Sequence, residues 1–184
     1  MPMPRLERDR TALLVVDLQQ KLMPLVEDHE QVQAQTIRLI RGCGVLGVPV
    51  LATEQYPAGL GQTVEPVSQA LAETNVQMVE KMKFSACVDA VHRKLVELNR
   101  TKVLICGIET HVCVLQTAID LQQRGLVPFV VGDAVSSRRA TDRDLAMQRM
   151  VTGGVAPVSV EMALLEMAGE AGTPVFKALL PIIR

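Results

Sequence analysis

Three residues whose chemistry is complementary stand at the ends of apolar segments. Asp17 follows LLVV, Lys81 closes VQMVEK, and Cys113 lies in GIETHVCV, shortly after KVLIC. A carboxylate can take the proton of a thiol, and a nearby ammonium favours the thiolate that remains. If the fold brings these side chains together, they could form a nucleophilic cysteine site that attacks a carbonyl carbon.

The elements that would position these residues alternate along the chain. Short apolar segments rich in β-branched residues predict strands, and the segments between them carry apolar residues at helical spacing. Because strand–helix–strand repeats form right-handed crossovers, we expect an α/β fold whose parallel sheet is covered by helices on both faces. Strands are predicted over residues 11–18, 48–54, 76–81, 102–107, 126–134 and 155–160, and helices from about His29, across Val88–Leu98, around Cys113 and from about Thr141.

Ligands of such sheets bind beyond the carboxyl ends of the strands, where Asp17, Lys81 and Cys113 are expected. Each residue also has a purely structural interpretation. Asp17 could cap a turn, Lys81 could be a solvated lysine like Lys83, and Cys113 could be a small core residue. Taken singly, Lys81 is better explained by a structural role, whereas structural and functional roles are equally supported for Asp17 and Cys113. The residues alone therefore leave both interpretations open.

The histidines do not supply a catalytic or metal-binding pattern. His111 and Cys113 are two positions apart and would face nearly opposite sides of a helix, which counts against a Cys–His dyad. His29 and His92 lie on predicted helices away from the strand ends, and no H-x-x-x-H spacing occurs. We therefore expect neither a metal nor a cofactor.

The segment GCGVLG, residues 42–47, matches the dinucleotide-binding pattern G-x-G-x-x-G. That pattern binds a pyrophosphate only when it follows a strand and opens a helix. Here it ends a predicted helix and leads into a strand. We interpret it as a helix C-cap and turn.

Composition restricts the class of protein. The chain has 184 residues, 48% hydrophobic and 2% aromatic, with a net charge of −1. These values favour one domain over residues 1–184 and count against binding to nucleic acid or to a membrane. The segment MPMPRLERDR lacks the apolar core of a signal peptide, and the four cysteines form no C-x-x-C pair. We expect a cytoplasmic protein with free thiols and a small-molecule substrate.

Three segments, ALLVVDLQ, EKMKFSAC and GIETHVCV, resemble the signature segments of the isochorismatase-like cysteine hydrolases. The similarity extends from about Thr11 to the last predicted strand. The loop TEQYPAGLG is similar to that of the isochorismatase domain-containing proteins. The resemblance implies a three-layer αβα fold with a six-stranded parallel sheet in the Rossmann-like order 3-2-1-4-5-6.

The resemblance also implies an Asp-Lys-Cys catalytic triad, which falls on Asp17, Lys81 and Cys113. Lys81 is chosen over Lys83 because the family lysine stands three residues before a Phe/Tyr-Ser pair, here Phe84 and Ser85. It further implies a cis peptide bond between Ile108 and Glu109.

The oxyanion hole is then expected at the backbone N–H groups of Glu109 and Cys113. Gln19, Tyr56 and His111 are expected to line the substrate pocket, and the Gly/Pro-rich loop that holds Tyr56 could act as a lid.

Two departures from the family pattern narrow the expected reaction. Isochorismatases proper generally lack the cysteine, and nicotinamidases have an Asp-x-His metal site that is absent from TEQYPAG. What remains is a hydrolase that cleaves an amide, carbamoyl or related C–N bond through a thioester on Cys113. The alternative is a redox-sensing or non-catalytic protein of the same fold.

The apolar segment 175–183, VFKALLPII, suggests self-association into a dimer or larger homo-oligomer.

Overall fold

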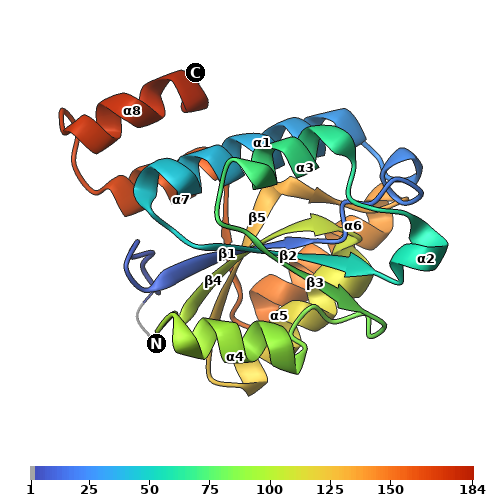
Figure 1. The fold of residues 1–184 in the computed structure, drawn as a ribbon. Coiled ribbons are helices and arrows are strands. Elements are labelled where there is room, and N and C mark those ends of the chain that lie inside the picture. Colours follow the sequence, from blue (N-terminus) through green and yellow to red (C-terminus); the bar gives the residue numbers. More distant parts are fainter. Residues whose placement is uncertain (1–2) are drawn as a thin grey trace.

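The computed structural model describes residues 3–184 and has a six-stranded parallel sheet between two layers of helices (Figure 1). The strand order is β3-β2-β1-β4-β5-β6, so the α/β class and the sheet order expected from the resemblance are confirmed. The strands are β1 Thr11–Val16, β2 Val50–Gln55, β3 Gln77–Lys81, β4 Lys102–Ile108, β5 Val127–Ser136 and β6 Ala156–Val158.

Helices cover both faces of the sheet, and each face has its own hydrophobic core. One core lies under α1, α3, α7 and α8, and the other lies under α4, α5 and α6. Successive side chains of β1 alternate between them: Leu13 and Val15 belong to the first core, whereas Leu14 and Val16 belong to the second. The helices are α1 His29–Leu46, α2 Pro57–Leu60, α3 Glu65–Ala72, α4 Asp89–Glu97, α5 Leu115–Gln123, α6 Ala140–Thr152, α7 Val160–Ala168 and α8 Pro174–Ile183.

Several element boundaries differ from the sequence-based expectation. The last predicted strand is shorter because Ser159 accepts a hydrogen bond from the backbone N–H of Met162 and so caps α7. The predicted helix around Cys113 begins with a π-helical turn, Thr110–Val114, before α5. Helices α2, α3, α7 and α8 were not predicted.

The glycine-rich segment 42–47 forms the end of α1, as interpreted from the sequence. Gly47 has a left-handed conformation with φ of 69° and donates its N–H to the carbonyls of Cys43 and Gly44. A Cβ atom on Gly42 would lie 2.5 Å from the side chain of Leu164. These glycines therefore end a helix and allow it to pack closely against α7.

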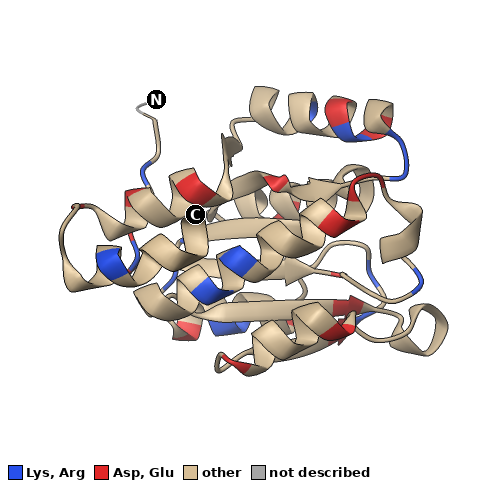
Figure 2. Cartoon of the chain, turned by 90° about the horizontal axis from the view of Figure 1, so that it is seen from above, with Lys and Arg blue, Asp and Glu red and all other residues tan. Residues whose placement is uncertain are grey.

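Acidic and basic residues are interspersed along the ribbon in Figure 2. Among residues 3–184, no helix is both long and apolar enough to cross a membrane.

Gly107 of β4 pairs with Val16, the last residue of β1. Gly107 has a φ of 118°, and a Cβ atom there would lie 2.0 Å from the carbonyl oxygen of Val16. Only glycine fits both the backbone conformation and the space.

We expect Gly107→Ala to destabilise the fold by at least about 2 kcal/mol more than the matched change Gly125→Ala. Gly125 also has a positive φ, 77°, but a Cβ there would meet no atom within 4 Å. The control therefore carries only the backbone strain of about 1–2 kcal/mol. Urea unfolding midpoints, compared at equal slope, measure the difference. Equal losses in the two variants would contradict the steric explanation.

Candidate active site

Asp17 lies directly after β1 and is fully buried. Its φ is 54°, a conformation that short polar residues tolerate better than most. Its Oδ1 accepts a hydrogen bond of 2.8 Å from the Thr53 hydroxyl, and its Oδ2 lies 2.6 Å from the Lys81 Nζ. The turn that ends β1 thus presents this carboxyl group to the ends of β2 and β3.

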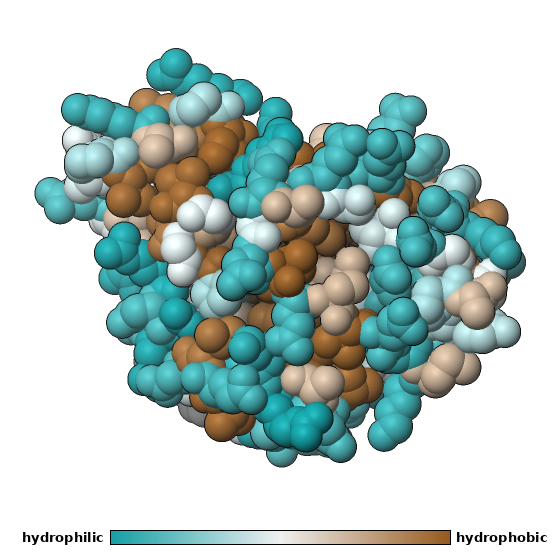
Figure 3. Space-filling view, in the orientation of Figure 1, coloured by the Kyte–Doolittle hydropathy of each residue, from teal (hydrophilic) through white to brown (hydrophobic). Residues whose placement is uncertain are grey.

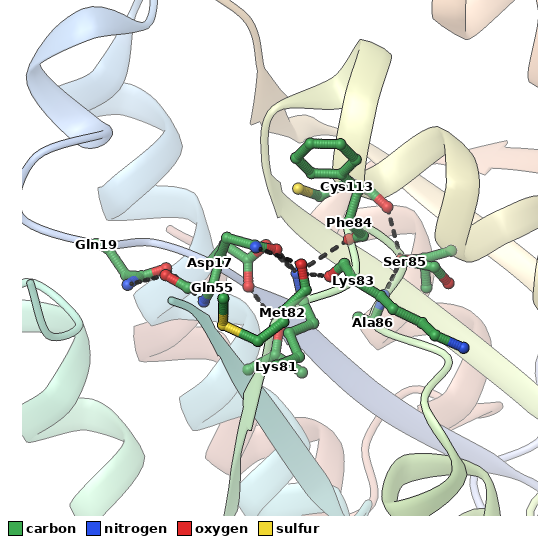
Figure 4. Close-up of polar contacts among 12 residues, drawn as sticks. Asp17, Gln19, Gln55, Lys81, Met82, Lys83, Phe84, Ser85, Ala86 and Cys113 are labelled. Carbon is green, nitrogen blue, oxygen red and sulfur yellow. Dashed lines mark hydrogen bonds and ion pairs between the residues drawn. The ribbon is translucent and has the colours of Figure 1, made fainter. Parts of the chain in front are cut away.

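Lys81 is the last residue of β3, and its ammonium group is surrounded by acceptors (Figure 4). Its Nζ donates to Asp17 Oδ2, to Gln55 Oε1 at 2.8 Å and to the Phe84 carbonyl at 2.9 Å, with the Lys83 carbonyl at 3.2 Å. An ammonium has three protons, so these contacts occupy all of them. Lys83, in contrast, is an exposed residue.

Cys113 lies in the π-helical turn between β4 and α5 and is 6% exposed. Its carbonyl accepts a 2.6 Å hydrogen bond from Thr117, which fixes the turn. The Asp17 carboxyl group and the backbone N–H of Glu109 lie near enough to the thiol to shift its pKa, the first raising it and the second lowering it. The peptide bond between Ile108 and Glu109 is cis, at the position that the resemblance implies. The structure therefore brings Asp17, Lys81 and Cys113 together from three separate elements.

Burial governs the protonation of the thiol. It raises the pKa of Cys113 to about 12, and the Asp17 charge adds to the rise, whereas Lys81 and the Glu109 N–H oppose it. Burial also raises the pKa of Asp17 above its ordinary value, against the opposing effects of Lys81 and Thr53. The resting cysteine is thus a thiol, because desolvation outweighs the cation that would favour a thiolate.

The three residues expected to line the pocket have different surroundings. Gln19 is fully buried, and its amide is bound to the Gln55 backbone at 2.7 and 2.9 Å and to the Gly61 carbonyl at 2.6 Å. Tyr56 is 48% exposed. His111 is half-buried, with its Nδ1 2.9 Å from the Ser137 hydroxyl. Tyr56 and His111 therefore remain accessible to a ligand, whereas both polar atoms of Gln19 are already engaged.

The loop after β2 is tied to the rest of the molecule. The Glu54 carboxylate accepts hydrogen bonds of 2.6 and 2.8 Å from the backbone and hydroxyl of Thr63. The Lys21 Nζ donates to the Gly59 carbonyl at 2.7 Å. In this structure the loop is held by these contacts at several points.

Two polar residues of the site were not identified from the sequence. Thr53 and Gln55 both lie on β2, where Thr53 binds Asp17 and Gln55 binds Lys81. The Gln55 amide is oriented by a second hydrogen bond of 2.9 Å, from its Nε2 to the Met82 carbonyl. Their alternate spacing on a strand, with both side chains at the carboxyl end, is the signal that could have indicated them.

No group of three or more His, Cys, Asp or Glu residues is placed to hold a metal ion within the described range 3–184. Gln55 is the last residue of β2, and its side-chain oxygen accepts a hydrogen bond from the Lys81 ammonium.

The isochorismatase domain matches residues 11–162 of the chain. The secreted isochorismatase effector Isc1 of Phytophthora sojae is 39% identical over 98% of this chain and 87% of that protein. Isochorismatase domain-containing protein 2A of Mus musculus is 38% identical over 98% of this chain and 85% of that protein.

Solved structures show the same similarity. The structure described as MAR1 ribonuclease from Caenorhabditis elegans is 38% identical, with a TM-score of 0.93 over 98% of this chain and 92% of that one. The YcaC gene product of Escherichia coli, described as an octameric hydrolase of unknown specificity, shares the fold at 22% identity, with a TM-score of 0.85 over 98% of this chain and 93% of that one. The chain belongs to the isochorismatase-like hydrolase family.

Proposed function

We propose that the chain is a cysteine hydrolase that cleaves a small-molecule amide, carbamoyl or related C–N bond. The observation that carries this proposal is that a buried thiol lies near a carboxyl group that is itself paired with a buried ammonium. The Lys81 and Asp17 side chains are both 0% exposed. Groups of this kind, brought together from different strands at the carboxyl edge of the sheet, are typical of catalytic sites.

The first half-reaction transfers the acyl group to the enzyme. Asp17 accepts the thiol proton as Cys113 Sγ attacks the carbonyl carbon, and the carbonyl oxygen gains the negative charge. The backbone N–H groups of Glu109 and Cys113 stabilise that oxyanion. Asp17 then returns the proton to the leaving nitrogen, the C–N bond breaks, and a thioester on Cys113 remains.

The second half-reaction restores the enzyme. A water molecule attacks the thioester, Asp17 accepts one of its protons, and the carbon–sulfur bond breaks. The thiolate takes the proton from Asp17, and the product leaves as the acid. Lys81 stays bound throughout, because its protons are committed to Asp17, Gln55 and Phe84. Its role is to stabilise the Asp17 carboxylate between proton transfers.

The relative described as a ribonuclease suggests another substrate class, but the cations of this site count against a phosphate substrate. The Lys81 ammonium has no free proton, and the Arg138 guanidinium is paired with Glu109 at 3.0 Å. Binding of RNA depends on free cations along the phosphate backbone. RNA is therefore tested together with the amides, because its cleavage alone would contradict the proposed C–N hydrolase.

A redox-sensing role has less support than hydrolysis. Sensor cysteines are exposed thiols with a low pKa. Burial raises the pKa of Cys113 to about 12, that of Cys106 to about 12 and that of Cys87 to about 11. The four cysteines are free and buried, which is compatible with the cytoplasmic location that we propose.

We also propose that the chain forms a homo-oligomer through the surface near α8. Leu179 is fully buried and Val175, Ile182 and Ile183 pack against the core, so part of the apolar segment 175–183 is already used within the chain. Apolar side chains nevertheless gather at the upper left of Figure 3, where α8 lies. The octameric state described for the YcaC protein is compatible with this proposal.

Activity is expected to depend on the Cys113 sulfur. Ammonia release from a panel of amides and carbamoyl compounds should fall at least a thousandfold, by order of magnitude, in Cys113→Ala, because the nucleophile is lost. Cys87→Ala, which removes a buried thiol with no contact to Asp17, serves as the control. A panel with no Cys113-dependent hydrolysis, or Cys113-dependent cleavage of RNA alone, would overturn the proposal.

The alkylation of Cys113 should depend on Asp17. Because Asp17 must be ionised to take the thiol proton, labelling by iodoacetamide should fall as the pH drops through the Asp17 pKa, which burial places above the usual range. It should persist at neutral pH, well below the pKa of the thiol. In Asp17→Asn, labelling at pH 7 should be about a hundredfold slower and should rise with the ionisation of the thiol alone. Peptide mass spectrometry resolves the four cysteines, and identical pH profiles would exclude Asp17 as the base.

Light scattering tests the oligomer. At about 10 µM protein, we expect a mass of at least twice that of the 20.1 kDa chain. A monomer at that concentration would contradict the proposed association.

A further inference from the structure

A second charged pair lies at the start of the π-helical turn that holds Cys113. The Glu109 carboxylate is 8% exposed, accepts two hydrogen bonds from Arg138 and forms an ion pair with the same residue. The Arg138 Nε and backbone N–H both donate to Oε2, at 3.1 and 3.0 Å, and Nη2 lies 3.0 Å from Oε1. This two-point contact of a guanidinium with a carboxylate fixes direction as well as distance.

Glu109 directly precedes the π-helical turn that holds Cys113, and its backbone N–H lowers the pKa of the thiol. Its carbonyl accepts hydrogen bonds from the N–H groups of Val112 and Val114, at 3.1 and 3.2 Å. These contacts come from the same π-helical turn and move with it. The Arg138 contact is different, because Arg138 lies in the segment between β5 and α6, outside that turn.

Stability does not account for the geometry of this pair. The Arg138 side chain is 59% exposed, and pairs with an exposed partner contribute little to the free energy of unfolding. The contact instead connects the turn that carries the nucleophile to the segment between β5 and α6. The nearby hydrogen bond between His111 Nδ1 and the Ser137 hydroxyl, 2.9 Å, links the same two segments.

We propose that Arg138 is a positioning residue that holds Glu109, so that the Glu109 backbone N–H stays directed at Cys113 and at the oxygen that becomes negative during attack. The proposal rests on the proposed hydrolase function. An oxyanion-hole donor stabilises the transition state only when it is held in place beforehand. Removing the clamp should therefore lower kcat and leave substrate binding nearly unchanged.

The test compares Arg138→Gln and Arg138→Lys with Arg139→Gln, which changes an exposed neighbouring arginine with no side-chain ion pair among residues 3–184. Rates are expressed per alkylatable Cys113, on the best amide of the panel. We expect kcat to fall about tenfold in Arg138→Gln, a partial share of the hundredfold or greater loss that follows deletion of a whole donor. Arg138→Lys keeps the positive charge but loses the two-point guanidinium contact, so its kcat should lie between those of the wild type and Arg138→Gln. KM should stay within about twofold of the wild-type value in every variant.

Three kinetic results would overturn the proposal. An unchanged kcat in Arg138→Gln would show that Glu109 holds its position without the clamp. A rise in KM with kcat unchanged would make Arg138 a substrate-binding residue instead. Additive losses in Arg138→Gln and Glu109→Gln would show that the two side chains do not act as one unit.

A second measurement separates this proposal from the hydrolase function itself. If the wild-type protein hydrolyses nothing on the panel, the hydrolase proposal fails, but the clamp remains testable by alkylation. In an Asp17→Asn background, where labelling follows the thiol's own ionisation, adding Arg138→Gln should move the pH profile of Cys113 to higher pH. The reason is that the Glu109 N–H lowers the pKa of the thiol. An unmoved profile would overturn the proposed positioning.

Discussion

The buried ion pair between Lys81 and Asp17 is the interaction on which the arrangement of the site depends. Removing two charges from water is costly, and the pair is tolerated only when every remaining proton and lone pair finds a partner. Here Thr53 binds the carboxyl group, while Gln55 and the Phe84 carbonyl complete the shell of the ammonium. The ends of β1, β2 and β3 must therefore coincide, as the pairings of Val16 with Thr53 and of Gln55 with Lys81 achieve.

The same burial decides how the nucleophile is generated. In a low-dielectric site with a neighbouring carboxylate, the thiol keeps its proton, as the raised pKa of Cys113 reflects. A stable thiolate–ammonium pair is thus not the resting state, and the proton moves only when the sulfur attacks. The Lys81 charge acts on Asp17 rather than on the substrate, because its three protons are already donated. The general-base catalysis that we propose follows from the packing as much as from the residue types.

How far the sequence could predict this arrangement depended on the kind of information required. Hydrophobic periodicity located the six strands. The rule that ligands bind at the carboxyl ends of strands then indicated Asp17, Lys81 and Cys113. That these residues converge could be expected only with the sheet order, which came from the family resemblance. Thr53 and Gln55 could not be predicted, because a side chain's partner depends on strand register, and a shift of one residue would reverse the face it occupies. Helix α8, which contains Pro181, lacked a recognisable helical pattern.

Cys113 follows β4, next to the point where the strand order reverses, so the residues around it come from different strands. The order reverses between β1 and β4, which is where open α/β sheets form a crevice for ligands. Asp17 directly follows β1 and Cys113 follows β4, so the thiol and its proposed base meet across this point. Gly107 permits the meeting, because a side chain there would collide with the Val16 carbonyl and separate the two strands. In the proposed mechanism, residues at the ends of β1 and β3 carry out proton transfer, whereas Glu109, between β4 and α5, stabilises the developing charge.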